Sequence, residues 1–142
     1  MWRLKASLIA TILVAILSVP GWGQTLMLFG GDSHKVYLGD LTSSKFDKDS
    51  VWNQFGEHGN PFNTNCIWNN FGPYGGEFSN DSPFNEFASN PPVIVDVKGN
   101  FYGYFTANRF YKKRTTIEPL LKILDNNKMI RANLDKFRDG MP

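Results

Sequence analysis

The chain has 142 residues, of which 42% are hydrophobic and 20% charged, with a formal net charge of +2 at pH 7. Its single cysteine excludes a disulfide within one chain, and so small a basic excess argues against nucleic acid as a partner. The length suits one small domain with a modest core.

Residues 1–23 have the pattern of a secretory signal peptide. A short basic start precedes an apolar run over residues 8–19, which Pro20 ends. This run is about 12 residues long, whereas a membrane-spanning helix needs roughly 20. We therefore expect cleavage after Gly23 and export to the periplasm or medium, with no transmembrane segment in residues 24–142.

Without that segment the chain has no net charge, but its charges are unevenly distributed. Residues 24–96 carry −6 and residues 97–142 carry +6. Either the two halves neutralise each other in the fold, or a basic cluster contacts an anionic surface. The candidate residues for that contact are Arg109, Lys112, Lys113 and Arg114.

Residues 25–41 predict the first hairpin. Apolar and β-branched residues on both sides flank a turn at Gly30-Gly31-Asp32-Ser33.

Residues 45–90 contain a segment that repeats at a step of sixteen residues. The aligned strings are SVWNQFG at 50–56, CIWNNFG at 66–72 and SPFNEFA at 82–88. One such unit cannot bury its own rings, so three stacked units are expected to share an interior of inward-pointing rings.

Each repeat is expected to begin with a short helical turn and to return in extended conformation. Asp49, Asn65 and Asp81 are the expected caps, and Gly56 and Gly72 are the expected left-handed stops. A β-solenoid coil is the rival structure. Phe55 shares one face of the turn with Trp52 three residues earlier, and the aligned Phe62 and Phe78 close against the next unit.

Residues 93–107 predict a second hairpin, with its turn at 97–100, and Pro91-Pro92 separates it from the repeats. Residues 115–138 predict a helical tail, as one broken helix or two short ones. Thr115 and Glu118 have the spacing of a capping box, and the interruption falls at residues 125–127. The expected fold is α+β, with the repeats inserted between two hairpins that form a small antiparallel sheet.

Three strings resemble a group of small uncharacterised secreted proteins of bacteria. They are LFGGDSHKVYLG at 28–39, the Ser-Ile/Val-Trp-Asn repeats, and PPVIVD at 91–96 with GNFYGYFT at 99–106. The resemblance implies a bacterial source and export, and it implies no activity. The group often has Cys-Leu-x-Cys where this chain has Asp40-Leu41-Thr42-Ser43, so a disulfide or metal role of that pair is absent here.

The aromatic repeats suggest a carbohydrate-binding ladder as a candidate site. Its residues would be Trp52, Asn53, Trp68, Asn69, Phe84 and Asn85, with rings under sugar faces and amides on hydroxyls. The alternative is that these rings form the core and that each Asn holds a turn.

The other chemical hypotheses are weaker. Paired oxygen donors such as Asp47 and Asp49 recur as in calcium-binding solenoids, although helix capping explains them without an ion. A cysteine hydrolase would need Cys66 beside His34 or His58, and the spacing does not require this. No catalytic residue, cofactor or metal is assigned.

The function expected from sequence is a non-catalytic envelope or extracellular module whose repeats act as scaffold or interaction surface. Its partner would be an envelope protein or a polysaccharide. The alternative is a carbohydrate-binding module, or an enzyme acting on cell-wall or polysaccharide material with Asp47, Asp49 or Asp96 in its site.

Overall fold

The computed structural model describes residues 24–142. The expectations about a signal segment concern residues 1–23, which lie outside this range. Among the described residues, no helix is both long enough and apolar enough to cross a membrane.

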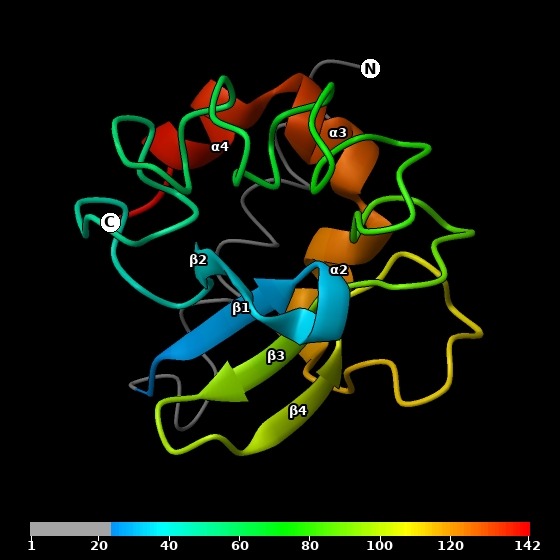
Figure 1. The fold of residues 1–142 in the computed structure, drawn as a ribbon. Coiled ribbons are helices and arrows are strands. Elements are labelled where there is room, and N and C mark those ends of the chain that lie inside the picture. The colour runs from blue at the N-terminus through cyan, green and yellow to red at the C-terminus, as the bar shows by residue number, and fades with distance from the viewer. Residues whose placement is uncertain (1–23) are drawn as a thin grey trace.

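Both predicted hairpins are present and together form one antiparallel sheet (Figure 1). The strands are β1 (Leu26–Gly30), β2 (Val36–Asp40), β3 (Val93–Asp96) and β4 (Phe101–Tyr104). Their order is β2-β1-β3-β4, because β1 pairs with β3 and so joins the hairpins. A short 3₁₀ turn, η1 (Asp32–His34), lies in the first hairpin.

At each edge of the sheet, an irregular segment lies beside the edge strand and forms one parallel β-bridge with it. At β2, Asp40 accepts from the N–H of Val51 and donates its own N–H to Asp49. At β4, Tyr104 does the same with Thr115 and Lys113. These bridges cover edges that would otherwise present unpaired backbone groups.

The tail forms three short helices, where one or two were expected: α2 (Glu118–Asp125), α3 (Asn127–Ala132) and α4 (Leu134–Asp139). The breaks fall at Asn126 and Asn133, whose side-chain amides donate to the carbonyls of Lys122 and Met129. These bonds occupy helix-end carbonyls and close each helix. The expected capping box is absent, because α2 has Ile117 at its N-cap and no side-chain cap.

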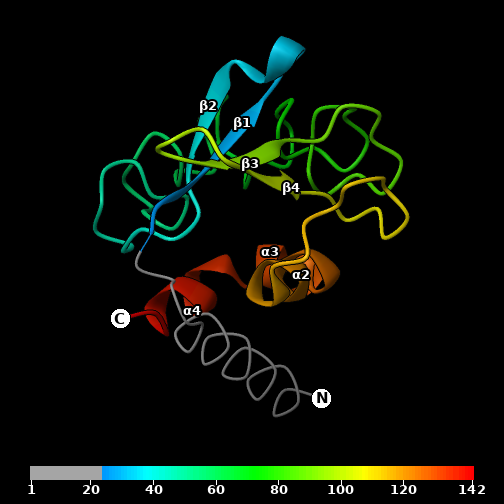
Figure 2. The same ribbon diagram turned by 90° about the horizontal axis from the view of Figure 1, so that it is seen from below.

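The helices cover one face of the sheet and seal a common core (Figure 2). Leu28 and Ile94 of the sheet lie in the same buried cluster as Leu120 and Leu124 of α2. The α+β class is therefore correct.

Residues 45–90 form successive β-turns, in place of the helical turns expected there (Figure 1). Hydrogen bonds from N–H to C=O follow one another at steps of three residues, with one step of four at Gly56 to Asn60 and again at Gly72 to Gly76. Four short steps and one long step make the sixteen-residue period. Gly56 and Gly72 are outside the left-handed region, so the expected glycine stops are wrong.

The predicted inward stacking of rings is confirmed. Trp52, Trp68 and Phe84 are each 3% exposed, with ring centroids 5.2 Å and 5.5 Å apart along the stack. Phe137 of α4 caps one end at 5.4 Å from Trp52, and Phe105 caps the other at 6.5 Å from Phe84. The core thus contains one column of five aromatic rings.

Candidate functional site

The three repeat asparagines make the same pair of hydrogen bonds. Each amide Nδ2 donates, at 3.0 Å, to the carbonyl six residues earlier, and each Oδ1 accepts from the backbone N–H two residues later. The accepting bonds run from Phe55 to Asn53, from Phe71 to Asn69 and from Phe87 to Asn85. These amides hold the turns, and each has one N–H and one oxygen lone pair occupied by the backbone.

The expectation that Trp52, Trp68 and Phe84 form a carbohydrate-binding ladder is therefore wrong. With 3% of each residue exposed, these rings have no free face for a sugar. The indole N–H groups are also occupied, since Trp52 Nε1 donates to Leu41 O and Trp68 Nε1 to Val51 O.

Other rings of the same repeats are largely exposed, in two sets that recur at sixteen-residue steps. We name Phe46, Phe62 and Phe78 the first row, and Phe55, Phe71 and Phe87 the second row. Their exposed fractions run from 78% for Phe46 to 101% for Phe71. The expectation that Phe55, Phe62 and Phe78 pack inward is wrong, because the chain forms β-turns here, and Trp52 and Phe55 lie inside successive turns and not on one face of a helix.

One more exposed ring, outside the rows and outside the predicted repeats, lies in the same type of turn. Phe110 is 95% exposed, and its N–H donates to Asn108 Oδ1 as in the earlier turns. Ala107 N donates to Pro83 O, which places this loop on the third repeat. Sequence reasoning missed it, although the Asn-x-Phe string at 108–110 was a usable signal.

Most of the exposed phenylalanines have a backbone N–H that is already hydrogen-bonded within the protein. This matters for any contact that excludes water. All but Phe78 donate their N–H to a side chain two residues earlier: Phe46 to Ser44, Phe55 to Asn53, Phe62 to Asn60, Phe71 to Asn69, Phe87 to Asn85 and Phe110 to Asn108. An N–H satisfied within the protein loses nothing when water is removed from the ring beside it.

Three hollows lie between the repeats and the helices. In each repeat, the residue between the Asn and the second-row Phe lines one of these hollows. Gln54 lines a hollow of about 240 Å³, Asn70 lines a hollow of about 370 Å³, and Glu86 lines a hollow of about 300 Å³. Phe46 and Phe55 both line the first, so one ring of each row lies beside the same hollow.

Two arginines of the helices bind the repeats. Arg131 donates to Asn70 Oδ1 and to Gly75 O, and its guanidinium lies 5.0 Å from the Phe84 ring. Arg138 is buried and donates to Gly59 O, while its Nε has no hydrogen-bond partner. Burial lowers the pKa of both guanidinium groups.

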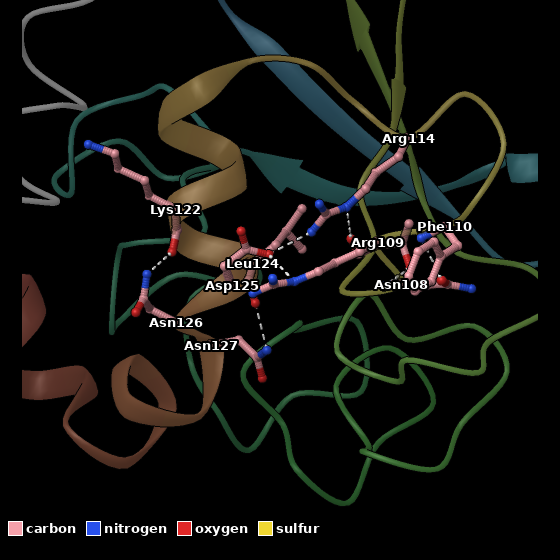
Figure 3. A network of polar contacts seen from close by, with 10 residues as sticks. Asn108, Arg109, Phe110, Arg114, Lys122, Leu124, Asp125, Asn126 and Asn127 are labelled. Carbon is pink, nitrogen blue, oxygen red and sulfur yellow. Dashed lines mark hydrogen bonds and ion pairs between the residues drawn. The ribbon is translucent and has the colours of Figure 1, made fainter.

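Two of the four residues of the predicted basic cluster, Arg109 and Arg114, form ion pairs with Asp125 (Figure 3). Arg114 pairs with Asp125 at 2.9 Å and donates to Thr106 O, and its side chain is only 13% exposed. Arg109 reaches the same carboxylate at 3.5 Å with a side chain that is 67% exposed. Lys112 and Lys113 are exposed. Arg114 therefore acts within the fold, whereas the two lysines and part of Arg109 face solvent.

Asp40, Asp47 and Asp49 place one carboxylate oxygen each within 4.8 Å of one another. Each already has a partner within the fold. Asp40 accepts from Tyr37 and Ser43, Asp47 accepts from the N–H of Asp49, and Asp49 pairs with Lys48. Burial and the bond to Asp40 raise the pKa of Tyr37.

The three residues that a cysteine hydrolase would need, Cys66, His34 and His58, each make contacts within the fold. Cys66 is fully buried, accepts the N–H of Trp68 and has its pKa raised to about 11 by burial. His34 contacts the carbonyl of Pro91, and His58 that of Asn65. Cys66 is thus a small packed side chain that also accepts a backbone N–H of its turn.

Comparisons with protein-family models, with curated proteins and with solved structures find no match to this chain. The functional argument therefore depends on the geometry described above.

Proposed function

We propose that the protein is an exported, non-catalytic module of the bacterial envelope or extracellular space, in which the repeats present rows of phenyl rings to a partner. The observation that carries this proposal is that six rings of one region are at least 78% exposed at matching repeat positions.

Exposed apolar area on this scale is unfavourable in water. Scattered surface apolar residues are ordinary, whereas large contiguous apolar patches mark interaction sites. We infer that the six phenyl rings, which come from one coil, form such a patch. Polar residues at these positions would keep the turns, because the Asn and Ser side chains one or two positions away form the stabilising bonds. The rings therefore contribute little to the fold, which supports a role in binding.

The ring positions are fixed by the scaffold. Each second-row Phe follows an Asn whose amide bonds the turn on both sides, and the buried rings behind it are stacked 5.2–5.5 Å apart. A preorganised surface of this kind loses little conformational entropy when it binds.

A carbohydrate-binding module is the second candidate. The regular step of the rows supports it, since a polymer with a short repeat could place successive units on successive rings. In this candidate, the exposed rings of Phe55, Phe71 and Phe87 contact the sugar units, and the buried rings of the column do not.

The test is a sedimentation assay with the exported protein, its N-terminus defined by mass spectrometry. The insoluble probes are peptidoglycan, cellulose, chitin and envelope membranes. We expect co-sedimentation with at least one probe, and at least tenfold weaker binding when Phe55, Phe71 and Phe87 are changed to Ser together. The melting temperature should be nearly unchanged, because these rings contribute little buried area.

A control variant with Thr64→Ser and Asn80→Ser changes exposed residues of the same repeats without removing a ring. It should bind like the original protein. Undiminished binding by a variant in which all six phenylalanines of the two rows are changed to Ser would overturn the proposal, whereas binding to a glycan alone would assign the second candidate.

A further inference from the structure

A different surface lies along β4, the edge of the sheet opposite the strand that meets the first repeat. The β3–β4 turn lies at one end of β4, and the loop that follows β4 lies at the other end (Figure 1). We name it the β4 face and define it by Val97, Lys98, Phe101, Phe110, Lys112 and Lys113.

The β4 face exposes apolar side chains at both of its ends. Val97 at the hairpin tip is 73% exposed, Phe101 is 48% exposed, and Phe110 in the following loop is 95% exposed. Ring contacts join the two ends, because Tyr104 lies 5.5 Å from Phe101 and 5.0 Å from Tyr111. The loop is thus held against the strand.

The positive charge of this face is not neutralised by its acids. Asp96 is 7% exposed, and its carboxylate accepts from the N–H groups of Lys98 and Asn100, the Asn100 amide and the Tyr102 hydroxyl. Asp125 is occupied by two arginines. Within residues 24–142, no acidic partner is found for Lys98, Lys112 or Lys113.

We propose that the β4 face binds the surface of an anionic phospholipid bilayer. Val97 and Phe110 enter the interfacial layer, while the three lysines contact the headgroups. Protruding apolar side chains beside unpaired lysines are the combination that anionic membranes attract, through apolar burial and surface potential together.

The charge distribution also selects this face over the phenylalanine rows. Residues 45–90 contain six acids and two lysines and would be repelled by an anionic surface, whereas residues 97–142 carry +6. Bilayer contact through β4 is separate from the partner binding proposed for the rows, so either can fail without the other.

The test is co-sedimentation with vesicles of phosphatidylglycerol and phosphatidylethanolamine, compared with phosphatidylcholine vesicles. All variants are produced by export and share one N-terminus, so any lipid affinity of that end contributes equally. We expect at least tenfold tighter binding to the anionic vesicles, weakening as salt is raised.

Lys112→Gln with Lys113→Gln should lower anionic-vesicle affinity about 25-fold, at about fivefold for each lysine. Lys48→Gln with Lys122→Gln removes the same charge elsewhere and should lower it less than threefold. Phe110→Ser should lower affinity about tenfold, whereas Phe71→Ser, in the same type of turn, should leave it unchanged.

A Phe110→Trp variant reports insertion directly. Its added fluorescence should shift to the blue and be quenched by brominated lipids on anionic vesicles. Equal binding to both vesicle types would overturn the proposal. So would binding that depends on the lysines but not on Phe110, which would instead indicate an anionic polymer as the partner.

Discussion

One asparagine in each repeat joins three turns of the chain. Asn69 donates to the carbonyl of Asn63, accepts from the N–H of Phe71 and offers its own carbonyl to Gly72. Ser and Cys at the preceding turn start accept an N–H in the same way, as Cys66 does for Trp68. Short polar side chains that bond nearby backbone favour such turns over helix, which explains why the expected helical turns did not form.

Cys66 tests this role of the turn-start residue. Cys66→Ser should change the free energy of unfolding by less than about 1 kcal/mol, because Ser50 and Ser82 serve at the equivalent positions. Cys66→Ala removes the sulfur that accepts the Trp68 N–H, leaves that N–H unsatisfied and should cost about 1–3 kcal/mol. Urea unfolding measures both, and equal effects would contradict the assigned bond.

Trp68 tests the ring column. Trp68→Ala should destabilise the protein by about 3–5 kcal/mol, because it leaves a cavity between two stacked rings. Trp68→Phe should cost less, since the third repeat carries Phe84 at this position. A melting temperature unchanged by Trp68→Ala would exclude the column as the core of the repeats.

At the scale of elements, both edge strands of the sheet contain a glycine that lets another segment approach closely. A glycine with positive φ, Gly39 (φ 108°) in β2 and Gly103 (φ 99°) in β4, lies where an irregular segment approaches the strand. A Cβ at Gly103 would lie 2.6 Å from Thr115 Cα and 2.7 Å from Thr115 N. The bridge from Thr115 to Tyr104 therefore requires glycine at this position.

Gly103→Ala should destabilise the fold by about 3 kcal/mol or more, because backbone must move as well as adopt a strained φ. Gly99 is the matched control, since its φ is also positive at 85° but a Cβ there meets nothing within 4 Å. Gly99→Ala should cost only about 1 kcal/mol. Equal losses in thermal unfolding would show that strain, not the close approach, decides.

The β3–β4 turn should show acid dependence through Asp96. Bonds from the Asn100 amide, together with those from the Tyr102 hydroxyl and two N–H groups, hold the pKa of Asp96 at about 2, below its ordinary 3.8. Its stabilisation is therefore complete above pH 3.8 and is lost as the pH falls through 2. Stability measured from pH 5 to pH 2 should fall less steeply for Asp96→Asn than for the original chain.

At the scale of the whole molecule, opposite charges in the two halves are only partly used to join them. Lys128 lies 3.9 Å from Glu77, and Arg131 binds Asn70. Both arginines that enter the repeats bond neutral oxygens. Glu57 and Glu86 of the repeats are exposed, as are the lysines of the β4 face, which is why a basic β4 face and acidic repeats can coexist.

Addition of EDTA should leave the melting temperature unchanged, and millimolar calcium should not raise it. The carboxylates of Asp40, Asp47 and Asp49 lie close together, but each is held by hydrogen bonds or an ion pair of the fold. Differential scanning calorimetry measures this. A clear drop with EDTA that calcium reverses would establish a structural ion in the first repeat.

Local patterns in the sequence were sufficient for the hairpins, the helical tail, the α+β class and the inward Trp52, Trp68 and Phe84. These features follow from alternation, turn residues and a period that aligns like residues, all of which act within a few positions or one repeat. The turn at Asn108 could also have been predicted, because it has the same Asn-x-Phe string.

Tertiary structure alone decided which phenylalanines are exposed. Trp52 and Phe55 have similar apolar surfaces, and only the closure of successive β-turns points one ring inward and the other outward. It also decided that Arg114 is enclosed while Lys112 and Lys113 are not, because Asp125 comes from a helix that packs beside their loop. Such outcomes depend on which distant segments meet, and local composition does not specify those contacts.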